Sequence, residues 1–145
     1  KLAVVGKGDY SIETEIKEEI RRNSLQDNVK MFGYLSGRDK YMVLKKSRFF
    51  VYPSIDESWG IVIMEALACG LPAIVYDLDA YRNIYPDGLI EMVPLRDTEQ
   101  FIAAMVDAVS GKNGKHSLQE RVDFARGFNW ADIMEKEYAD IISRL

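Results

Sequence analysis

The chain has 145 residues, of which 48% are hydrophobic and 29% are charged. This composition excludes an intrinsically disordered chain, and the length is sufficient for one domain with a buried core. The net charge of −4 argues against general nucleic-acid binding, so we expect no nucleic-acid partner. No apolar run reaches the roughly 20 residues that a membrane span requires. The single cysteine, Cys69, cannot form an internal disulfide and indicates a reducing compartment, so we expect a cytoplasmic protein.

Short apolar segments along the chain predict β-strands at residues 2–5, 29–32, 49–52, 71–76 and 90–93. Segments between and after these strands predict helices at residues 13–22, 39–46, 61–69, 97–109, 117–126 and 130–144. Ser117 and Glu120 form a capping-box pattern, Asp97 and Gln100 form an approximate one, and Asn129 can cap the last helix. The intervening segment 77–88 is a polar, turn-rich connection.

Alternation of strands and helices is typical of the α/β class. We therefore predict a Rossmann-like, doubly wound parallel sheet of about five strands with C-terminal helices, formed by residues 1–145 as one domain. The chain begins with Lys1 directly before a core strand, so we expect it to be a piece of a longer protein.

The segment 49–77 carries the strongest functional signal. Its two strands are continuously apolar, which indicates a parallel sheet covered on both faces. Glu65 is the only charged residue in the helix between them, and burying an unpaired carboxylate costs roughly several kcal/mol. Glu57 lies in the loop at the carboxyl end of the first strand, where open α/β sheets bind ligands. Together with the helix N-terminus at Gly60, the two carboxylates predict a site in one crevice.

The same residues also have structural interpretations. Glu57 could cap its helix and Glu65 could accept from a backbone amide, although the pair together favours a site. Gly6-Lys7-Gly8 lacks the third glycine of a dinucleotide-binding fingerprint, so it indicates a tight strand-to-helix turn, with Lys7 placed to meet an anion.

Three further features favour structural roles. His116 is the only histidine and lies in a Gly- and Lys-rich loop, so we expect it to be solvated and to supply neither a general base nor a metal ligand. Asp77 and Asp79 follow a strand, where a metal role is conceivable but turn and capping roles are favoured. The apolar stripe over 130–144 indicates core, with contact to a partner domain as the alternative.

The segment ESWGIVIMEALACGLPAIVYD, from Glu57 to Asp77, resembles a motif of retaining family 4 glycosyltransferases, in which seven residues separate two glutamates. Those enzymes have the two-domain GT-B fold. Ser58-Trp59-Gly60 stands where the family has Gly-Phe-Gly. The resemblance continues in order along nearly the whole chain, in KLAVVGKG, NVKMFGYLS, SRFFVYPS, EMVPLRDTEQFIAAM and FNWADI. The chain is thus similar to the C-terminal, donor-binding domain of that family.

The resemblance implies that the full-length enzyme transfers a sugar from a nucleotide-diphosphate donor to an acceptor with retention. It implies that Glu57 is catalytic and contacts the transferred sugar, and that Glu65 binds the ribose hydroxyls. The other implied donor-binding residues are Ser58, Trp59, Gly60 and Ile61 at the diphosphate or sugar, Gly33, Tyr34 and Leu35 at the base, and Lys7. No metal and no cofactor are implied. The implied partners are the nucleotide sugar, an N-terminal acceptor domain and, through that domain, a membrane surface.

Two departures from the family pattern affect these expectations. Residues 77–83 lack the family's glycine-rich turn, so Arg82 becomes a candidate for anion binding. The family's upstream Arg and Lys and its acceptor domain have no counterpart in this sequence, so we expect weak nucleotide binding and no turnover by these residues alone. Three alternatives stay open: another GT-B activity such as a nucleotide-sugar epimerase or a phosphorylase-like transfer, a non-catalytic nucleotide-binding or assembly module, and a general Rossmann-like cofactor domain, which the missing glycine fingerprint disfavours.

Overall fold

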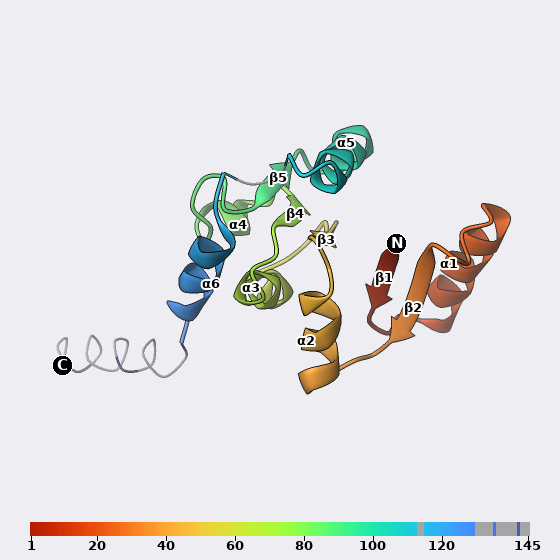
Figure 1. Cartoon of the computed structure of the whole chain (residues 1–145), viewed down its shortest axis with the longest axis horizontal. Coiled ribbons are helices and arrows are strands. Elements are labelled where there is room, and N and C mark those ends of the chain that lie inside the picture. Colours follow the sequence, from red (N-terminus) through yellow and green to blue (C-terminus); the bar gives the residue numbers. More distant parts are fainter. Residues whose placement is uncertain (113–114, 130–134, 136–141, 143–145) are drawn as a thin grey trace. The chain divides into compact units, whose positions relative to one another are not determined.

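The computed structural model describes residues 1–112, 115–129, 135 and 142. The chain divides into two compact units, Lys1–Lys46 and Ser47–Leu145. Figure 1 shows their strands and helices. No helix of the described residues is long and apolar enough to cross a membrane.

The N-terminal unit is a strand–helix–strand repeat followed by a second helix. Strand β1 (Leu2–Val5) pairs in parallel with β2 (Val29–Gly33), and helix α1 (Tyr10–Arg22) connects them. Helix α2 (Gly37–Lys45) follows. The register of the two strands shifts between Val4 and Val5, and the Gly6 amide then donates to the Gly33 carbonyl at 2.8 Å.

Helix α1 begins three residues earlier than the charge pattern predicts. Asp9 has extended backbone geometry and takes the N-cap position, and the Gly8 amide donates to the Glu13 carboxylate at 3.3 Å. Acidic Glu13 lies in the first turn, while the last turn is basic, an order that the helix dipole favours. The Gly6-Lys7-Gly8 segment is thus a strand-to-helix turn.

The C-terminal unit contains a three-stranded parallel sheet in the order β3-β4-β5. Its elements are β3 (Phe50–Tyr52), α3 (Ile61–Ala68), β4 (Ala73–Tyr76), α4 (Asp79–Arg82), β5 (Glu91–Val93), α5 (Thr98–Val109) and α6 (Leu118–Arg126). Strand β4 begins at Ala73 rather than at residue 71 because Pro72 has no N–H to donate, although its carbonyl accepts from the Phe50 amide at 2.9 Å.

The core of this unit is built on both faces of β4, whose four residues are all buried. Ala73 and Val75 belong to a cluster with residues of α3 and with Tyr81 and Tyr85. Ile74 and Tyr76 belong to a second cluster with residues of β5 and α5. Helix α3 therefore covers one face of the sheet and α5 covers the other (Figure 1), as expected for a doubly wound sheet.

The α/β class, the parallel pairing and the two covered faces are confirmed. The five strands are present: β1 and β2 pair within the N-terminal unit, and β3, β4 and β5 pair within the C-terminal unit. The connection over 77–88 contains a short helix, α4, which the turn-rich composition does not predict. The helix predicted over 130–144, with its cap at Asn129 and its apolar stripe, lies outside the described residues.

Candidate functional site

The loop after β3 holds Glu57 beside the end of that strand. The Tyr52 hydroxyl, on the last residue of β3, donates a short hydrogen bond to Glu57 Oε1. Oε2 of the same carboxylate has no hydrogen-bond partner among the described residues. Helix α3 begins without a side-chain cap, so the interpretation of Glu57 as a helix cap is wrong. The carboxylate is half-buried and held by a neighbouring strand residue instead.

Gly60 is the N-cap of α3 and has left-handed backbone geometry, with φ of 69°. A Cβ at this position would lie 2.8 Å from Ile63 Cδ1 and 3.0 Å from Tyr81 Cε1. The Tyr85 hydroxyl donates to the Gly60 carbonyl at 3.4 Å. Glycine is therefore required here by its backbone conformation and by packing against the core, in addition to any approach of a ligand.

Glu65 lies in the second turn of α3, between the buried residues Met64 and Ala66. Its side chain is half-buried rather than enclosed. A half-buried carboxylate bears less of the desolvation cost than an enclosed one would. Cys69, the C-cap residue of this helix, is also half-buried.

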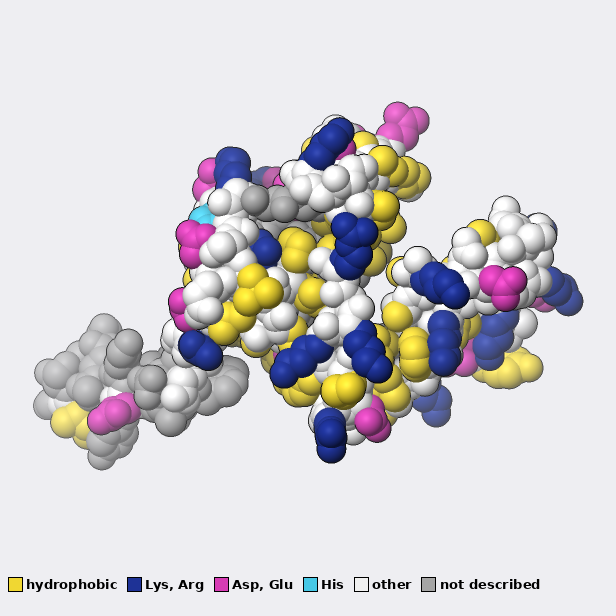
Figure 2. Space-filling model, in the orientation of Figure 1, with side chains coloured by type: hydrophobic (Ala, Val, Ile, Leu, Met, Phe, Trp, Pro, Cys, Tyr) yellow, Lys and Arg dark blue, Asp and Glu magenta, His cyan; other side chains and the backbone are white. Residues whose placement is uncertain are grey.

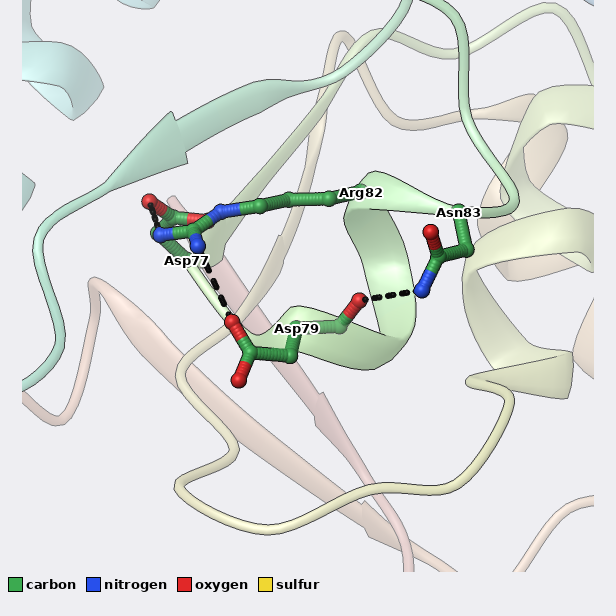
Figure 3. Close-up of polar contacts among 4 residues, drawn as sticks. All are labelled: Asp77, Asp79, Arg82 and Asn83. Atoms are coloured by element: carbon green, nitrogen blue, oxygen red, sulfur yellow. Dashed lines mark hydrogen bonds and ion pairs between the residues drawn. The ribbon is translucent and has the colours of Figure 1, made fainter.

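A cluster of charged side chains follows β4, in the segment 77–83 that lacks the family's glycine-rich turn (Figure 3). Arg82 donates from Nε to Asp77 Oδ1 at 2.8 Å and from Nη2 to Asp77 Oδ2 at 2.6 Å, and it contacts Asp79 Oδ1 at 2.9 Å. These hydrogen bonds hold the pKa of Asp77 below its usual range. The guanidinium is thus engaged by two carboxylates, and the two aspartates pair with this cation. Among the described residues, no group of three or more His, Cys, Asp or Glu could hold a metal ion.

The remaining predicted donor-binding residues belong to the N-terminal unit. Lys7 and Tyr34 are exposed, Tyr34 by 73%, while Leu35 is half-buried. Gly33 has φ of 68° and borders a depression of about 230 Å³. The other lining residues are Val4, Gly6, Glu13, Lys17, Met31 and Phe32. Lys7, Gly33, Tyr34 and Leu35 therefore lie in one unit, whereas Glu57, Glu65 and Ser58–Ile61 lie in the other.

Three tyrosines, Tyr52, Tyr81 and Tyr85, interact electrostatically with Glu57, and the sequence pattern does not single them out. Burial, followed by the hydrogen bond and charge of Glu57, raises the pKa of Tyr52. Burial first and the charge of Glu57 second raise the pKa of both Tyr81 and Tyr85 above the usual range. In the sequence these residues resemble ordinary core aromatics. Their only distinguishing signal is the hydroxyl, which in most buried tyrosines lies beside a hydrogen-bond partner.

His116 is half-buried, so the prediction that it is solvated is wrong. Its Nε2 lies 3.2 Å from the Asp87 carbonyl, and its Nδ1 lies 3.5 Å from Glu120 Oε1. Arg121 is buried nearby and donates to the carbonyls of Gly70 and His116. These contacts tie the start of α6 to the end of α3 and have no connection to Glu57.

Comparisons with known proteins place the chain in a family. Residues 1–125 match the family described as "Glycosyl transferases group 1". The chain is 29% identical over 140 residues to the phosphatidyl-myo-inositol mannosyltransferase of Mycobacterium leprae, covering 90% of this chain and 34% of that protein. It is 24% identical over 144 residues to the alpha-monoglucosyldiacylglycerol synthase of Streptococcus pneumoniae, covering 98% of this chain and 32% of that protein. The chain thus spans about a third of the length of these relatives.

Solved structures share the fold. The lipopolysaccharide outer core galactosyltransferase WaaB has a TM-score of 0.81 at 18% identity, with 100% of this chain and 41% of that chain covered. HepE of Anabaena, solved in complex with UDP-glucose, has a TM-score of 0.78 at 20% identity, covering 99% of this chain and 40% of that chain. At these identities the likeness establishes the fold, and the family match establishes the relationship. The chain belongs to the glycosyl transferases group 1 family.

Proposed function

We propose that this chain is the C-terminal, donor-binding domain of a retaining family 4 glycosyltransferase with the GT-B fold. In this proposal the complete enzyme transfers a sugar from a nucleotide-diphosphate donor to an acceptor. The named relatives, a mannosyltransferase and a glucosyldiacylglycerol synthase, support sugar transfer. Similar structures that contain UDP-glucose, or UDP and GlcNAc, support a nucleotide-sugar donor. Because the chain spans about a third of its relatives, the acceptor domain belongs to the rest of such an enzyme.

The observation that carries the proposal is the state of Glu57. A carboxylate placed only to cap α3 would accept from the first-turn amides, but Glu57 accepts from Tyr52 and leaves Oε2 without a partner among the described residues. It lies at the carboxyl end of a parallel strand, where ligands of α/β sheets bind. We assign Oε2 to a hydroxyl of the transferred sugar.

The other roles follow from the chemistry of the donor. Glu65 supplies carboxylate oxygens for the two ribose hydroxyls, which are hydrogen-bond donors. The amides of Ser58–Ile61 at the start of α3 bind the diphosphate or sugar, aided by the helix dipole. Gly33, Tyr34 and Leu35 contact the base largely through the main chain, and Lys7 binds an anion. Departure of the nucleoside diphosphate is then helped mainly by electrostatic stabilisation.

A titration of the isotope-labelled chain tests these assignments. UDP-glucose, GDP-mannose and ADP-glucose are added separately up to millimolar concentration, and backbone amide shifts are followed by NMR. At least one donor is expected to shift the amides of Ser58–Ile61. Glu65→Ala is expected to weaken that binding about ten-fold, because the ribose loses a hydrogen bond to a charged group.

Glu99→Ala is the matched control, because Glu99 is an exposed glutamate in the first turn of α5. It should bind the donor like the wild type. If Glu65→Ala binds as well as the wild type, the ribose assignment fails. If none of the three donors shifts an amide in the 57–65 segment, the donor-binding role of this chain fails.

A further inference from the structure

The last residue of β3 presents its side chain to the proposed sugar-binding carboxylate. Tyr52 OH donates to Oε1 of Glu57, which lies only five positions further along the chain. A phenol hydroxyl that donates to one carboxylate oxygen restricts the rotation of the carboxylate and leaves the second oxygen available to another donor. Oε2 is the oxygen left without a partner among the described residues.

Strand β3 holds Tyr52 in a fixed position from which its hydroxyl can orient the Glu57 carboxylate. Tyr52 pairs with Val75 of β4 in the sheet register, and its ring lies 6.0 Å from that of Phe50 in a stacked arrangement. It packs against the core cluster that contains Val75 and Tyr81. The hydroxyl is therefore positioned by a residue of the sheet, whereas Glu57 lies in the loop that follows the strand.

The backbone on the other side of Glu57 is held by two more tyrosines. The Tyr81 ring fills the space beside Gly60, where no Cβ could fit, and Tyr85 OH donates to the Gly60 carbonyl. The charge of Glu57 contributes to the raised pKa of both phenols. Of the three tyrosines, Tyr52 is the one that donates a hydrogen bond to Glu57 among the described residues.

Resting on the proposed function, we infer that Tyr52 is a positioning residue for Glu57, which it orients so that Oε2 meets a hydroxyl of the transferred sugar. Tyr52 acts through Glu57 and has no assigned contact with the nucleotide. The consequence is selective: loss of the phenol hydroxyl should weaken binding of the sugar part of the donor and leave binding of the nucleotide part unchanged.

Tyr52→Phe tests this selectivity. The variant and the wild type are titrated with UDP-glucose, GDP-mannose and ADP-glucose, each beside its own nucleoside diphosphate. For the donor that binds the wild type more tightly than its diphosphate, the variant is expected to lose about ten-fold in sugar-nucleotide affinity and less than about two-fold in diphosphate affinity. Equal losses for both ligands, or no loss, would overturn the positioning role.

Tyr76→Phe is the matched control. Tyr76 is a buried tyrosine on the neighbouring strand β4, but it belongs to the cluster on the opposite face of the sheet, beside Phe101. The same atom is removed from the same kind of side chain, at a distance from Glu57. This variant should retain the wild-type ratio of sugar-nucleotide to diphosphate affinity, and a changed ratio would show that the effect of Tyr52→Phe is not specific.

A ligand-free measurement separates this inference from the proposed function. In protein labelled with ¹³C at tyrosine Cζ, Glu57→Gln should lower the pKa of Tyr52, because the negative charge that contributes to raising it is removed. An unchanged Tyr52 titration overturns the inference whatever the donor does. If the titration changes but no sugar nucleotide binds more tightly than its diphosphate, the sugar contact in the proposed function fails instead.

Discussion

At the scale of single residues, Tyr81 and Tyr85 form a matched pair that lies beside Gly60. Both are buried, and their rings meet edge to face at 6.0 Å. Tyr85 OH donates to the Gly60 carbonyl, whereas Tyr81 OH has no hydrogen-bond partner among the described residues. A buried hydroxyl without a partner costs stability, while a bonded one contributes modestly. The two hydroxyls should therefore affect folding in opposite directions.

We predict that Tyr81→Phe raises the free energy of unfolding by about 1 kcal/mol, because it removes a buried polar atom without a partner. Tyr85→Phe should lower it by roughly 0.5–1 kcal/mol, a small loss because the Gly60 carbonyl also accepts from the Ile63 amide at 2.8 Å. Urea unfolding of both variants measures the two values. A loss of stability in Tyr81→Phe would show that its hydroxyl has found a partner in solution.

The raised pKa values of Tyr52, Tyr81 and Tyr85 predict how stability depends on alkaline pH. In the folded chain these phenols hold their protons more tightly than in the unfolded chain, where the tyrosine pKa is about 10. Their contribution is therefore complete below about pH 10 and is lost as pH rises through the folded values. Urea unfolding between about pH 8 and 11 should show falling stability above pH 10, and Tyr81→Phe should reduce the slope. A flat profile would contradict the raised pKa values.

At the scale of elements, the junction between α3 and α6 depends on Gly70. This glycine follows α3 with φ of 79°, and a Cβ there would lie 2.4 Å from Leu118 Cγ. Its carbonyl accepts from the buried Arg121 at 3.0 Å. Helix α6 itself begins with a complete Ser117–Glu120 capping box, as the sequence predicts. The approach of the two helices is thus set by a residue that has no side chain.

Gly70→Ala should destabilise the chain by roughly 2–4 kcal/mol, because it combines left-handed backbone strain with a clash against Leu118. Gly111→Ala is the matched control: its φ is 76°, but nothing lies within 4 Å of its Cβ position. It should cost only the strain, about 1 kcal/mol. Thermal and urea unfolding of the pair separates the two causes. Equal losses would show that the α3–α6 contact contributes nothing at this position.

At the scale of the whole molecule, the two units differ in how much they bury. No residue of Lys1–Lys46, all of which are described, is fully buried, whereas β4 and much of α3 are. Figure 2 shows hydrophobic side chains on the surface, and the N-terminal unit exposes Leu2, Val5, Tyr10, Ile12, Leu25, Phe32 and Tyr34 among others. Local stability follows buried apolar contact, so the units should open with different free energies.

Native-state hydrogen exchange should reveal this difference. Amides of β1 and β2 are expected to exchange at least about ten-fold faster than those of β4, because about 1.4 kcal/mol of lower opening free energy corresponds to that ratio. The comparison uses strands of similar length within one sample, so solution conditions are shared. Equal protection of β1 and β4 would show that the first unit is as stable as the second.

Much of the fold follows from local pattern. Continuous apolar runs predict all five strands to within two residues, and the caps at Asp97 and Ser117 place the starts of α5 and α6. The short helix α4 was missed because a single turn of helix among Asp and Asn has the composition of a loop. The pairing of Asp77 with Arg82 depends on this helical turn, which brings together two side chains that lie five positions apart in the sequence (Figure 3).

The candidate site likewise has some features that the sequence predicts and others that only packing decides. The motif around Glu57 and Glu65 could be recognised from residue types and spacing, because those are written in consecutive positions of the chain. Two details could not be predicted from the sequence: whether Glu57 caps a helix or accepts from Tyr52, and how deeply Glu65 is buried. Both depend on packing between a strand, a loop and helices. Hydrophobic periodicity reports which face of an element turns inward but not which atoms meet there. The family and the strands and helices can therefore be recognised from the sequence. The hydrogen-bond partners of each carboxylate are decided only by the tertiary contacts of β3, α3 and α4.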